Sequence, residues 1–179
     1  MIPGQPILEQ PAGPFTAIFR ILMNPNARLS DSPPRQVRNP AGASGQTAEI
    51  KKRVFLVEDH PLMRRSIAET IEREPELTVC GQAEDAATAL AVIQSQPPDI
   101  VLTDIRLKSS SGLDLIHSLR TRWPALSIVA TTMFDAKQIE RLARAAGASA
   151  FVSKVDGPEK MIAVLRGVLE AGDRDGHND

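Results

Sequence analysis

The chain has 179 residues and a net charge of −1, and 42% of its residues are apolar. A charge so close to zero gives no electrostatic case for a surface that binds nucleic acid or a membrane. A single cysteine, Cys80, excludes a disulfide framework within the chain and fits a reducing compartment. The sequence has neither an apolar run of the roughly 20 residues that a membrane span needs nor a secretory signal. We therefore expect a cytoplasmic protein with no membrane segment.

The first 50 residues differ in composition from the rest. They hold eight of the fourteen prolines, with Gly, Ser, Asn and Gln between them. Such a segment buries too little apolar surface to offset its ordering entropy, so we predict a mostly disordered extension over 1–50. Its apolar stretch FTAIFRILM (15–23) is either a sticky part of the tail, sequence upstream of the true start codon, or a helix that docks a partner. We expect a folded domain over 51–172 and a disordered tail over 173–179.

From residue 51 onward, strand-like and helix-like stretches alternate five times. The predicted strands cover 54–57, 77–83, 99–103, 126–131 and 148–153. The predicted helices run from Pro61 up to Pro75 and over 84–96, 112–123, 135–146 and 157–172. Prolines supply several of the boundaries: Pro61 fits a first helical position, and Pro97 and Pro98 stop the second helix. Gly147 is placed to cap the fourth helix.

This alternation with short connections predicts a doubly wound α/β fold, in which helices cover both faces of a five-stranded parallel sheet. The apolar runs VFLV and IVL lack alternation, as expected of strands that are buried on both faces. The flavodoxin-like strand order 2-1-3-4-5 is one common solution for such a chain, with its switch point between strands 1 and 3. Ligands of such sheets bind beyond the carboxyl ends of the strands.

Polar side chains follow the predicted strands at this edge of the sheet. Glu58 and Asp59 follow strand 1, Asp104 follows strand 3, and Lys154 follows strand 5. Two carboxylates about 4 Å apart repel by roughly 4 kcal/mol at an effective dielectric constant of 20, so positive charge must compensate them. Lys154 supplies one charge, and a divalent cation would supply two. Because all the candidate ligands are oxygens, we predict Mg²⁺ before Ca²⁺. A cation, a lysine and a hydroxyl at the end of strand 4 together favour phosphoryl transfer.

The segments VFLVEDHPLMRRSI, DIVLTDIRLKSSSGLDLI, ATTMF and GASAFVSK resemble a response-regulator receiver domain of two-component (phosphorelay) signalling. The likeness covers residues 52 to about 171 and is closest to receivers that usually precede a helix-turn-helix output domain. It implies that Asp104 is the phosphoacceptor and that Asp59 is a direct Mg²⁺ ligand. It also implies that Glu58 acts on the metal through water and that the backbone carbonyl of Arg106 is a further ligand.

The resemblance also assigns residues that respond to phosphorylation. Thr132 would be the switch hydroxyl, Phe151 the switch aromatic, and Lys154 the ammonium that contacts the phosphoryl group. Thr131 is the alternative to Thr132. We prefer Thr132 because Met133, the residue after it, fits the family pattern.

The sequence departs from the family pattern at two positions. Lys108 and Val155 stand where the family commonly has proline, which leaves open the loop shapes there and whether the peptide bond after Lys154 is cis. Two further positions, Arg106 and Phe134, tune the hydrolysis of the acyl phosphate in the family. Both residues are bulky here, so we predict slow loss of phosphate.

The function that the resemblance implies is a phosphorylation switch. A histidine kinase or histidine phosphotransfer protein would phosphorylate Asp104 with Mg²⁺, in a reaction that the receiver itself catalyses, and the protein would not be an enzyme on an external substrate. A downstream protein partner would read the surface formed by helix 135–146, strand 148–153 and helix 157–172. Homodimerisation on phosphorylation is a further expectation.

Three alternatives have different weights. The chain could be a fragment of a receiver-plus-helix-turn-helix transcription regulator, but the 25 residues after Lys154 are too few for an output domain. Residues 1–50 contain four Arg, no Lys and three acidic residues, so we expect no direct DNA binding.

A phosphorylation-independent pseudo-receiver would not need the complete set of Asp104, Asp59, Thr132 and Lys154. A Mg²⁺-dependent phosphatase would be expected to carry a D-x-D motif and a cap insertion, which the sequence lacks.

Overall fold

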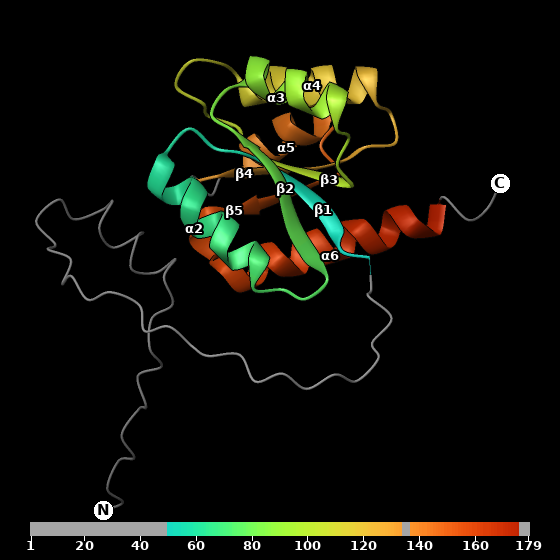
Figure 1. Cartoon of the computed structure of the whole chain (residues 1–179). Helices are drawn as coiled ribbons and strands as arrows, with labels where there is room; N and C mark the ends of the chain where they lie inside the picture. Colours follow the sequence, from blue (N-terminus) through green and yellow to red (C-terminus); the bar gives the residue numbers. More distant parts are fainter. Residues whose placement is uncertain (1–49, 134–136, 176–179) are drawn as a thin grey trace, which may run out of the picture.

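The fold is built around a sheet of five parallel strands. The structure is a computed structural model that describes residues 50–133 and 137–175. The strand order is β2-β1-β3-β4-β5, as predicted from the sequence (Figure 1). The strands are β1 (Lys52–Val57), β2 (Leu77–Ala83), β3 (Ile100–Asp104), β4 (Ser127–Thr132) and β5 (Ala150–Ser153).

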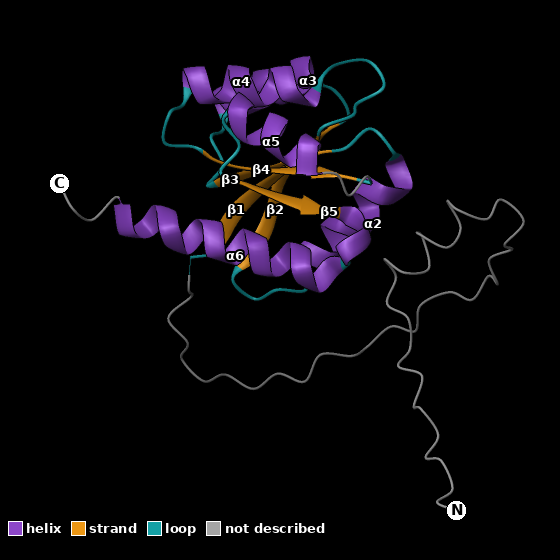
Figure 2. Cartoon of the chain, turned by 180° about the vertical axis from the view of Figure 1, so that it is seen from behind, coloured by secondary structure: helices purple, strands orange, loops and turns teal. Residues whose placement is uncertain are grey.

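Five helices cover the two faces of this sheet. They are α2 (Pro61–Glu72), α3 (Ala86–Ser95), α4 (Gly112–Arg122), α5 (Lys137–Ala146) and α6 (Pro158–Asp175), and a short 3-10 turn spans Lys154–Asp156. Helices α3, α4 and α5 lie on one face, and α2 and α6 lie on the other (Figures 1 and 2). The doubly wound α/β class predicted from the alternating pattern is therefore confirmed.

The alternation of side chains along each strand feeds two separate apolar clusters. In β3, Ile100 and Leu102 pack toward α2 and α6, whereas Val101 packs toward α3, α4 and α5. All five residues of β3 are buried. This explains the continuous apolar run in the sequence, since a central strand covered on both faces has no solvent side. It also means that the polar end of the strand, Asp104, is held in place by a rigid scaffold.

Caps move one helix start and one strand start by two residues from their predicted positions. Helix α3 starts at Ala86 because the Asp85 side chain accepts a hydrogen bond from the Thr88 N–H at 2.8 Å. Helix α5 ends at Ala146, as predicted, and the next residue, Gly147, has a φ of 110°. The Gly147 and Ala148 N–H groups donate to the carbonyls of Arg144 and Ala143, which is the Schellman arrangement. Because Ala148 belongs to this cap, β5 begins only at Ala150.

The carboxyl-terminal tail predicted over 173–179 is wrong for its first three residues, because α6 continues to Asp175. Asp173 forms an ion pair with Lys52 of β1 at 2.7 Å, and the Arg174 guanidinium donates to the Glu170 carbonyl. These contacts extend the helix past Gly172. Residues 1–49, with the apolar stretch 15–23, lie outside the described residues, as do Phe134 and 176–179. Within the described ranges, no helix is long and apolar enough to cross a membrane.

Candidate functional site

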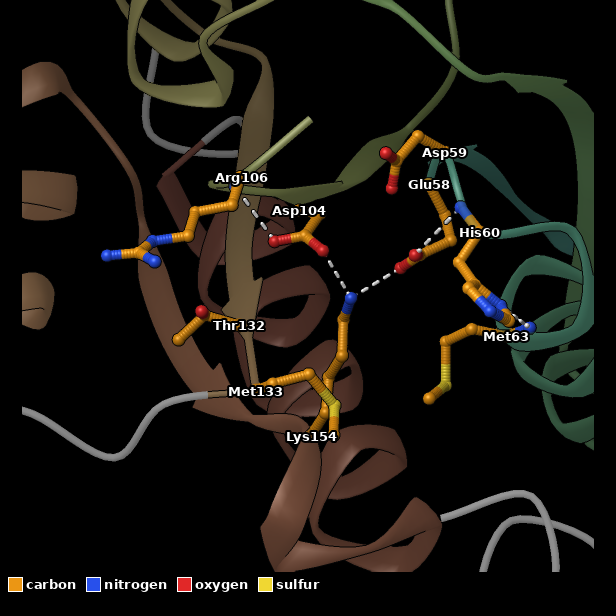
Figure 3. A pocket seen from close by; sticks show the side chains of 9 residues that line it. All are labelled: Glu58, Asp59, His60, Met63, Asp104, Arg106, Thr132, Met133 and Lys154. Carbon is orange, nitrogen blue, oxygen red and sulfur yellow. Dashed lines mark hydrogen bonds and ion pairs between the residues drawn. The ribbon is translucent and has the colours of Figure 1, made fainter. Parts of the chain in front are cut away.

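Three carboxylates meet at the carboxyl edge of the sheet. Glu58 and Asp59 follow β1, and Asp104 ends the neighbouring strand β3. One carboxylate oxygen from each lies within 4.8 Å of the other two. They line a pocket of about 190 Å³ (Figure 3). Glu58 and Asp104 are buried, whereas the side chain of Asp59 is 12% exposed. The predicted convergence of these three residues is therefore what the structure shows.

Lys154 reaches into this pocket from the end of β5 and pairs with two of the three carboxylates. Its ammonium lies 2.5 Å from Glu58 Oε2 and 2.5 Å from Asp104 Oδ2 (Figure 3). The Lys154 residue is only 2% exposed. A lysine is almost never buried unless it is paired, so this position is occupied for its charge. The peptide bond that follows it is trans, since the described residues contain no cis peptide.

Burial raises the pKa of the Glu58 carboxyl above its ordinary value, because a charged carboxylate is poorly solvated in this pocket. The Lys154 ammonium acts in the opposite direction but does not cancel the effect. The His60 N–H also donates to Glu58 Oε1, at 3.3 Å. Glu58 therefore keeps its proton to a higher pH than an exposed glutamate does.

Asp104 is positioned by the turn between β3 and α4. The Arg106 N–H donates to Asp104 Oδ1 at 2.9 Å, and the Gly112 N–H donates to the Ile105 carbonyl at 3.0 Å. A Cβ at Gly112 would lie 2.0 Å from the Asp104 carbonyl oxygen, so only glycine fits. The two Asp104 carboxylate oxygens thus have separate partners, one on the backbone and one on Lys154.

His60, and not Glu58 or Asp59, caps the helix that follows the acidic pair. Its Nδ1 accepts a hydrogen bond from the Met63 N–H at 3.3 Å. The acidic pair therefore does not cap this helix. Asp59 instead accepts a hydrogen bond from the Lys108 N–H at 2.9 Å.

The structure brings Thr132 into the pocket lining and leaves Thr131 and Phe151 outside it. Thr131 is fully buried, and within the described part of the chain its hydroxyl has no hydrogen-bond partner. Phe151 is partly buried and packs against the cluster under α3, α4 and α5. The geometry thus favours Thr132 over Thr131 as the hydroxyl at the site. The switch roles of Thr132 and Phe151 stay predictions.

Some residues near the site were not foreseen. His60, Met63 and Met133 complete the pocket lining with the side chain of Arg106 (Figure 3). The guanidinium of Arg64 donates to the Glu58 carbonyl at 2.5 Å. The available signal was position: His60 and Met133 adjoin predicted site residues, and Met63 and Arg64 lie on the first turns of the helix that follows.

The donor set fits a hard divalent cation. The three residues offer only carboxylate oxygens, and one of them, Asp59, remains partly accessible to solvent. Mg²⁺ is bound through one or two carboxylates and keeps several water molecules, which a pocket of about 190 Å³ can hold. The geometry therefore combines a cation-compatible acidic cluster with a buried lysine and a hydroxyl.

Comparisons with known proteins agree with this arrangement. Residues 54–166 match the response regulator receiver domain family. The chain is 35% identical over 102 residues to the DNA-binding transcriptional activator DevR/DosR of Mycobacterium tuberculosis, covering 57% of this chain and 47% of that protein. It is 33% identical over 113 residues to the nitrate/nitrite response regulator protein NarP of Escherichia coli, covering 63% of this chain and 53% of that protein. The chain thus spans about half the length of these relatives.

A solved structure shows the same fold. The two-component response regulator of the LuxR family from Aurantimonas sp. SI85-9A1 superposes with a TM-score of 0.65 at 30% sequence identity, covering 68% of this chain and 86% of that one. The family match extends from β1 into α6 and includes every residue of the acidic pocket. This chain therefore belongs to the receiver domain family of two-component response regulators.

Proposed function

We propose that Asp104 accepts a phosphoryl group from a phosphohistidine of a histidine kinase or histidine phosphotransfer protein. The observation that carries the proposal is the Lys154 ammonium, which is buried between Glu58 and Asp104 at 2.5 Å from each. A carboxylate at a rigid strand end, beside a fixed positive charge, is placed to act as a nucleophile toward an anionic group. A histidine kinase as the donor is what the family leads us to expect.

In the proposed reaction, a carboxylate oxygen of Asp104 forms a bond to phosphorus while the phosphorus–nitrogen bond of the donor breaks. The bonding electron pair returns to the donor imidazole, and Asp104 becomes an acyl phosphate. Lys154 and the Thr132 hydroxyl, which both line the pocket, would stabilise the added negative charge. Glu58, Asp59, Asp104 and the Arg106 carbonyl would hold Mg²⁺, which would neutralise charge on the transferring oxygens.

The test is the intact mass of the full chain after incubation with a small-molecule phosphodonor and Mg²⁺. We expect a gain of one phosphoryl group that is lost in Asp104→Asn and in the presence of a chelator. Asp114→Asn is the matched control, since Asp114 is exposed on α4 and does not line the pocket. No gain in the native chain would favour a phosphorylation-independent interaction module, and a gain that persists in Asp104→Asn would assign the chemistry to another residue.

The output is also a proposal. Phosphorylation would shift the surface formed by α5, β5 and α6 between two states, and a downstream protein would bind one of them. Homodimerisation on phosphorylation, a cytoplasmic location and slow phosphate loss stay predictions. Light scattering and the decay of the phosphorylated mass test dimerisation and phosphate loss directly.

One observation favours a second candidate, namely a role in transcription. The relatives DevR/DosR and NarP are regulators of which this chain spans about half. DNA binding by the phosphorylated chain itself, measured by fluorescence anisotropy at several salt concentrations, would support that candidate. Its absence would agree with a protein partner.

A further inference from the structure

Lys108 makes two contacts with Asp59, the most accessible of the three carboxylates. Its main-chain N–H donates to Asp59 Oδ2 at 2.9 Å, and its side-chain ammonium lies 3.9 Å from the same oxygen. The lysine side chain is 75% exposed, whereas that of Asp59 is 12% exposed. One residue thus supplies both a main-chain donor and an exposed positive charge at the rim of the pocket.

The loop that carries Lys108 is anchored on both sides, so its N–H is held in place. Leu107, directly before it, is 8% exposed and packs in the apolar cluster under α3, α4 and α5. Arg106 and Ser111 pair as an isolated antiparallel bridge, and the Ser110 hydroxyl accepts a hydrogen bond from the Ala86 N–H at 3.1 Å. The contact with Asp59 is therefore made by an ordered loop.

The two contacts have opposite consequences for a cation at Asp59. A hydrogen bond from the main chain orients the carboxylate before the cation arrives and leaves the second oxygen for it, which favours binding. The ammonium neutralises the same carboxylate and repels a divalent cation, which opposes binding. Salt screens the repulsion between the ammonium and the cation, because the ammonium is exposed. The orienting effect of the main-chain hydrogen bond is not screened in this way.

We propose that Lys108 is a positioning residue that sets the affinity of the pocket for a divalent cation, because its N–H orients Asp59 and its ammonium competes there. This inference rests on the proposed function, since it takes Asp59 as a cation ligand. A proline at this position would supply neither contact, because it has no N–H and no charge. The lysine therefore couples the affinity for the cation to the ionic strength of the medium.

The experiment is calorimetric titration of the full chain with Mg²⁺ alone, at low and at high ionic strength. Lys108→Met removes the ammonium and keeps the N–H, so we expect affinity about threefold tighter than in the native chain at low ionic strength. This gain should shrink at high ionic strength. Lys108→Pro removes both contacts and should bind about fivefold more weakly than Lys108→Met. Lys160→Met removes one exposed positive charge from α6, away from the pocket, and should match the native chain.

Two outcomes would overturn the proposal. If Lys108→Met binds no more tightly than the native chain or Lys160→Met, the ammonium does not compete at Asp59. If Lys108→Pro and Lys108→Met have equal affinities, the N–H does not orient it. A merely structural role of the loop would lower the free energy of unfolding without a salt-dependent change in affinity. An Asp59→Asn variant distinguishes a failure of the Lys108 proposal from a failure of the proposed metal site. If that substitution leaves the Mg²⁺ affinity unchanged, the metal site itself is contradicted.

Discussion

At the scale of single residues, the site depends on how three buried or half-buried carboxylates are balanced by charge. The Lys154 ammonium lies 2.5 Å from a carboxylate oxygen of both Glu58 and Asp104. Because Lys154 is only 2% exposed, water cannot reach the two carboxylates to solvate them in its place. Removing one partner from a buried ion pair leaves the other charge without compensation. The stability of the domain and the chemistry of the site therefore depend on the same lysine.

We expect Lys154→Met to lower the free energy of unfolding by about 3 kcal/mol at pH 8, because two carboxylates are then buried without their cation. The loss should be smaller at pH 5. Unpaired buried carboxylates bind protons more readily in the folded than in the unfolded state, so stability falls as pH rises. Urea unfolding at the two pH values measures both effects, with the exposed Lys160→Met as control. Equal losses at both pH values would contradict the electrostatic account.

The raised pKa of Glu58 makes the free energy of unfolding depend on pH in a second way. Because its folded-state pKa lies above the unfolded value, the folded state holds more protons between the two values. The free energy of unfolding contributed by this group therefore decreases as pH rises through that window. Glu58→Gln removes this term, so the stability of the variant relative to the native chain should increase as pH rises above the ordinary pKa of a glutamate. The exposed Glu159→Gln should show no such gain in urea unfolding at the same pH values.

The sequence was sufficient to predict where Asp104, Lys154 and the acidic pair lie, because each is at or just past the end of a strand. Parallel strands end at one edge of a sheet. The sequence was not sufficient to predict the contact of Lys108 with Asp59. That contact depends on the path of an irregular loop, which no periodic pattern describes. Nor could spacing decide between Thr131 and Thr132, since a one-residue shift reverses the face to which a strand side chain points.

At the scale of elements, the turn from β3 into α4 is where fold and site meet. We expect Gly112→Ala to lower the free energy of unfolding by about 2 kcal/mol, because its Cβ would lie 2.0 Å from the Asp104 carbonyl oxygen and the turn must shift. The shift would move Asp104, so phosphorylation by a small-molecule donor should also slow. Both quantities are measured on the same preparation, by urea unfolding and by intact mass.

Gly167→Ala in α6 is the matched control for this substitution. A Cβ there meets nothing within 4 Å, so the gain in helix propensity should raise the free energy of unfolding by about 0.5 to 1 kcal/mol. If both alanine variants had the same effect, the close approach at Gly112 would not be the cause. The opposite signs expected here separate steric fit from propensity.

Whether the sequence could predict an element boundary depends on whether that boundary is set locally or by tertiary contacts. Pro61 begins α2 and Gly147 terminates α5 through backbone restrictions that act locally, and both lie where they were expected. The extension of α6 past Gly172 was missed because it involves the ion pair of Asp173 with Lys52, two residues that lie 121 positions apart in the chain. Tertiary contacts of this kind leave no trace in a local pattern.

At the scale of the whole molecule, the sheet has two covered faces, and α6 closes one of them. Four apolar side chains of α6 are buried against residues of β1, β3, β4 and β5 in the apolar cluster that lies toward α2 and α6. They are Met161, Ile162, Leu165 and Leu169. Burial of one such side chain contributes about 1.5 kcal/mol or more, so the four contribute at least about 6 kcal/mol together. That is comparable to the roughly 5 to 15 kcal/mol that stabilise an ordinary domain.

A chain that ends at Gly157 should therefore lose cooperative unfolding, whereas a chain that ends at Gly172 should keep it. The second truncation removes the Lys52–Asp173 ion pair, whose side chains are 36% and 63% exposed. Exposed pairs contribute about 1 kcal/mol at most, so we expect the urea midpoint to move only slightly. Circular dichroism across a urea gradient compares both truncated chains with the native one. A cooperative transition without α6 would show that the other face alone holds the sheet, and a large loss on ending at Gly172 would make the last turn of α6 part of the folding unit.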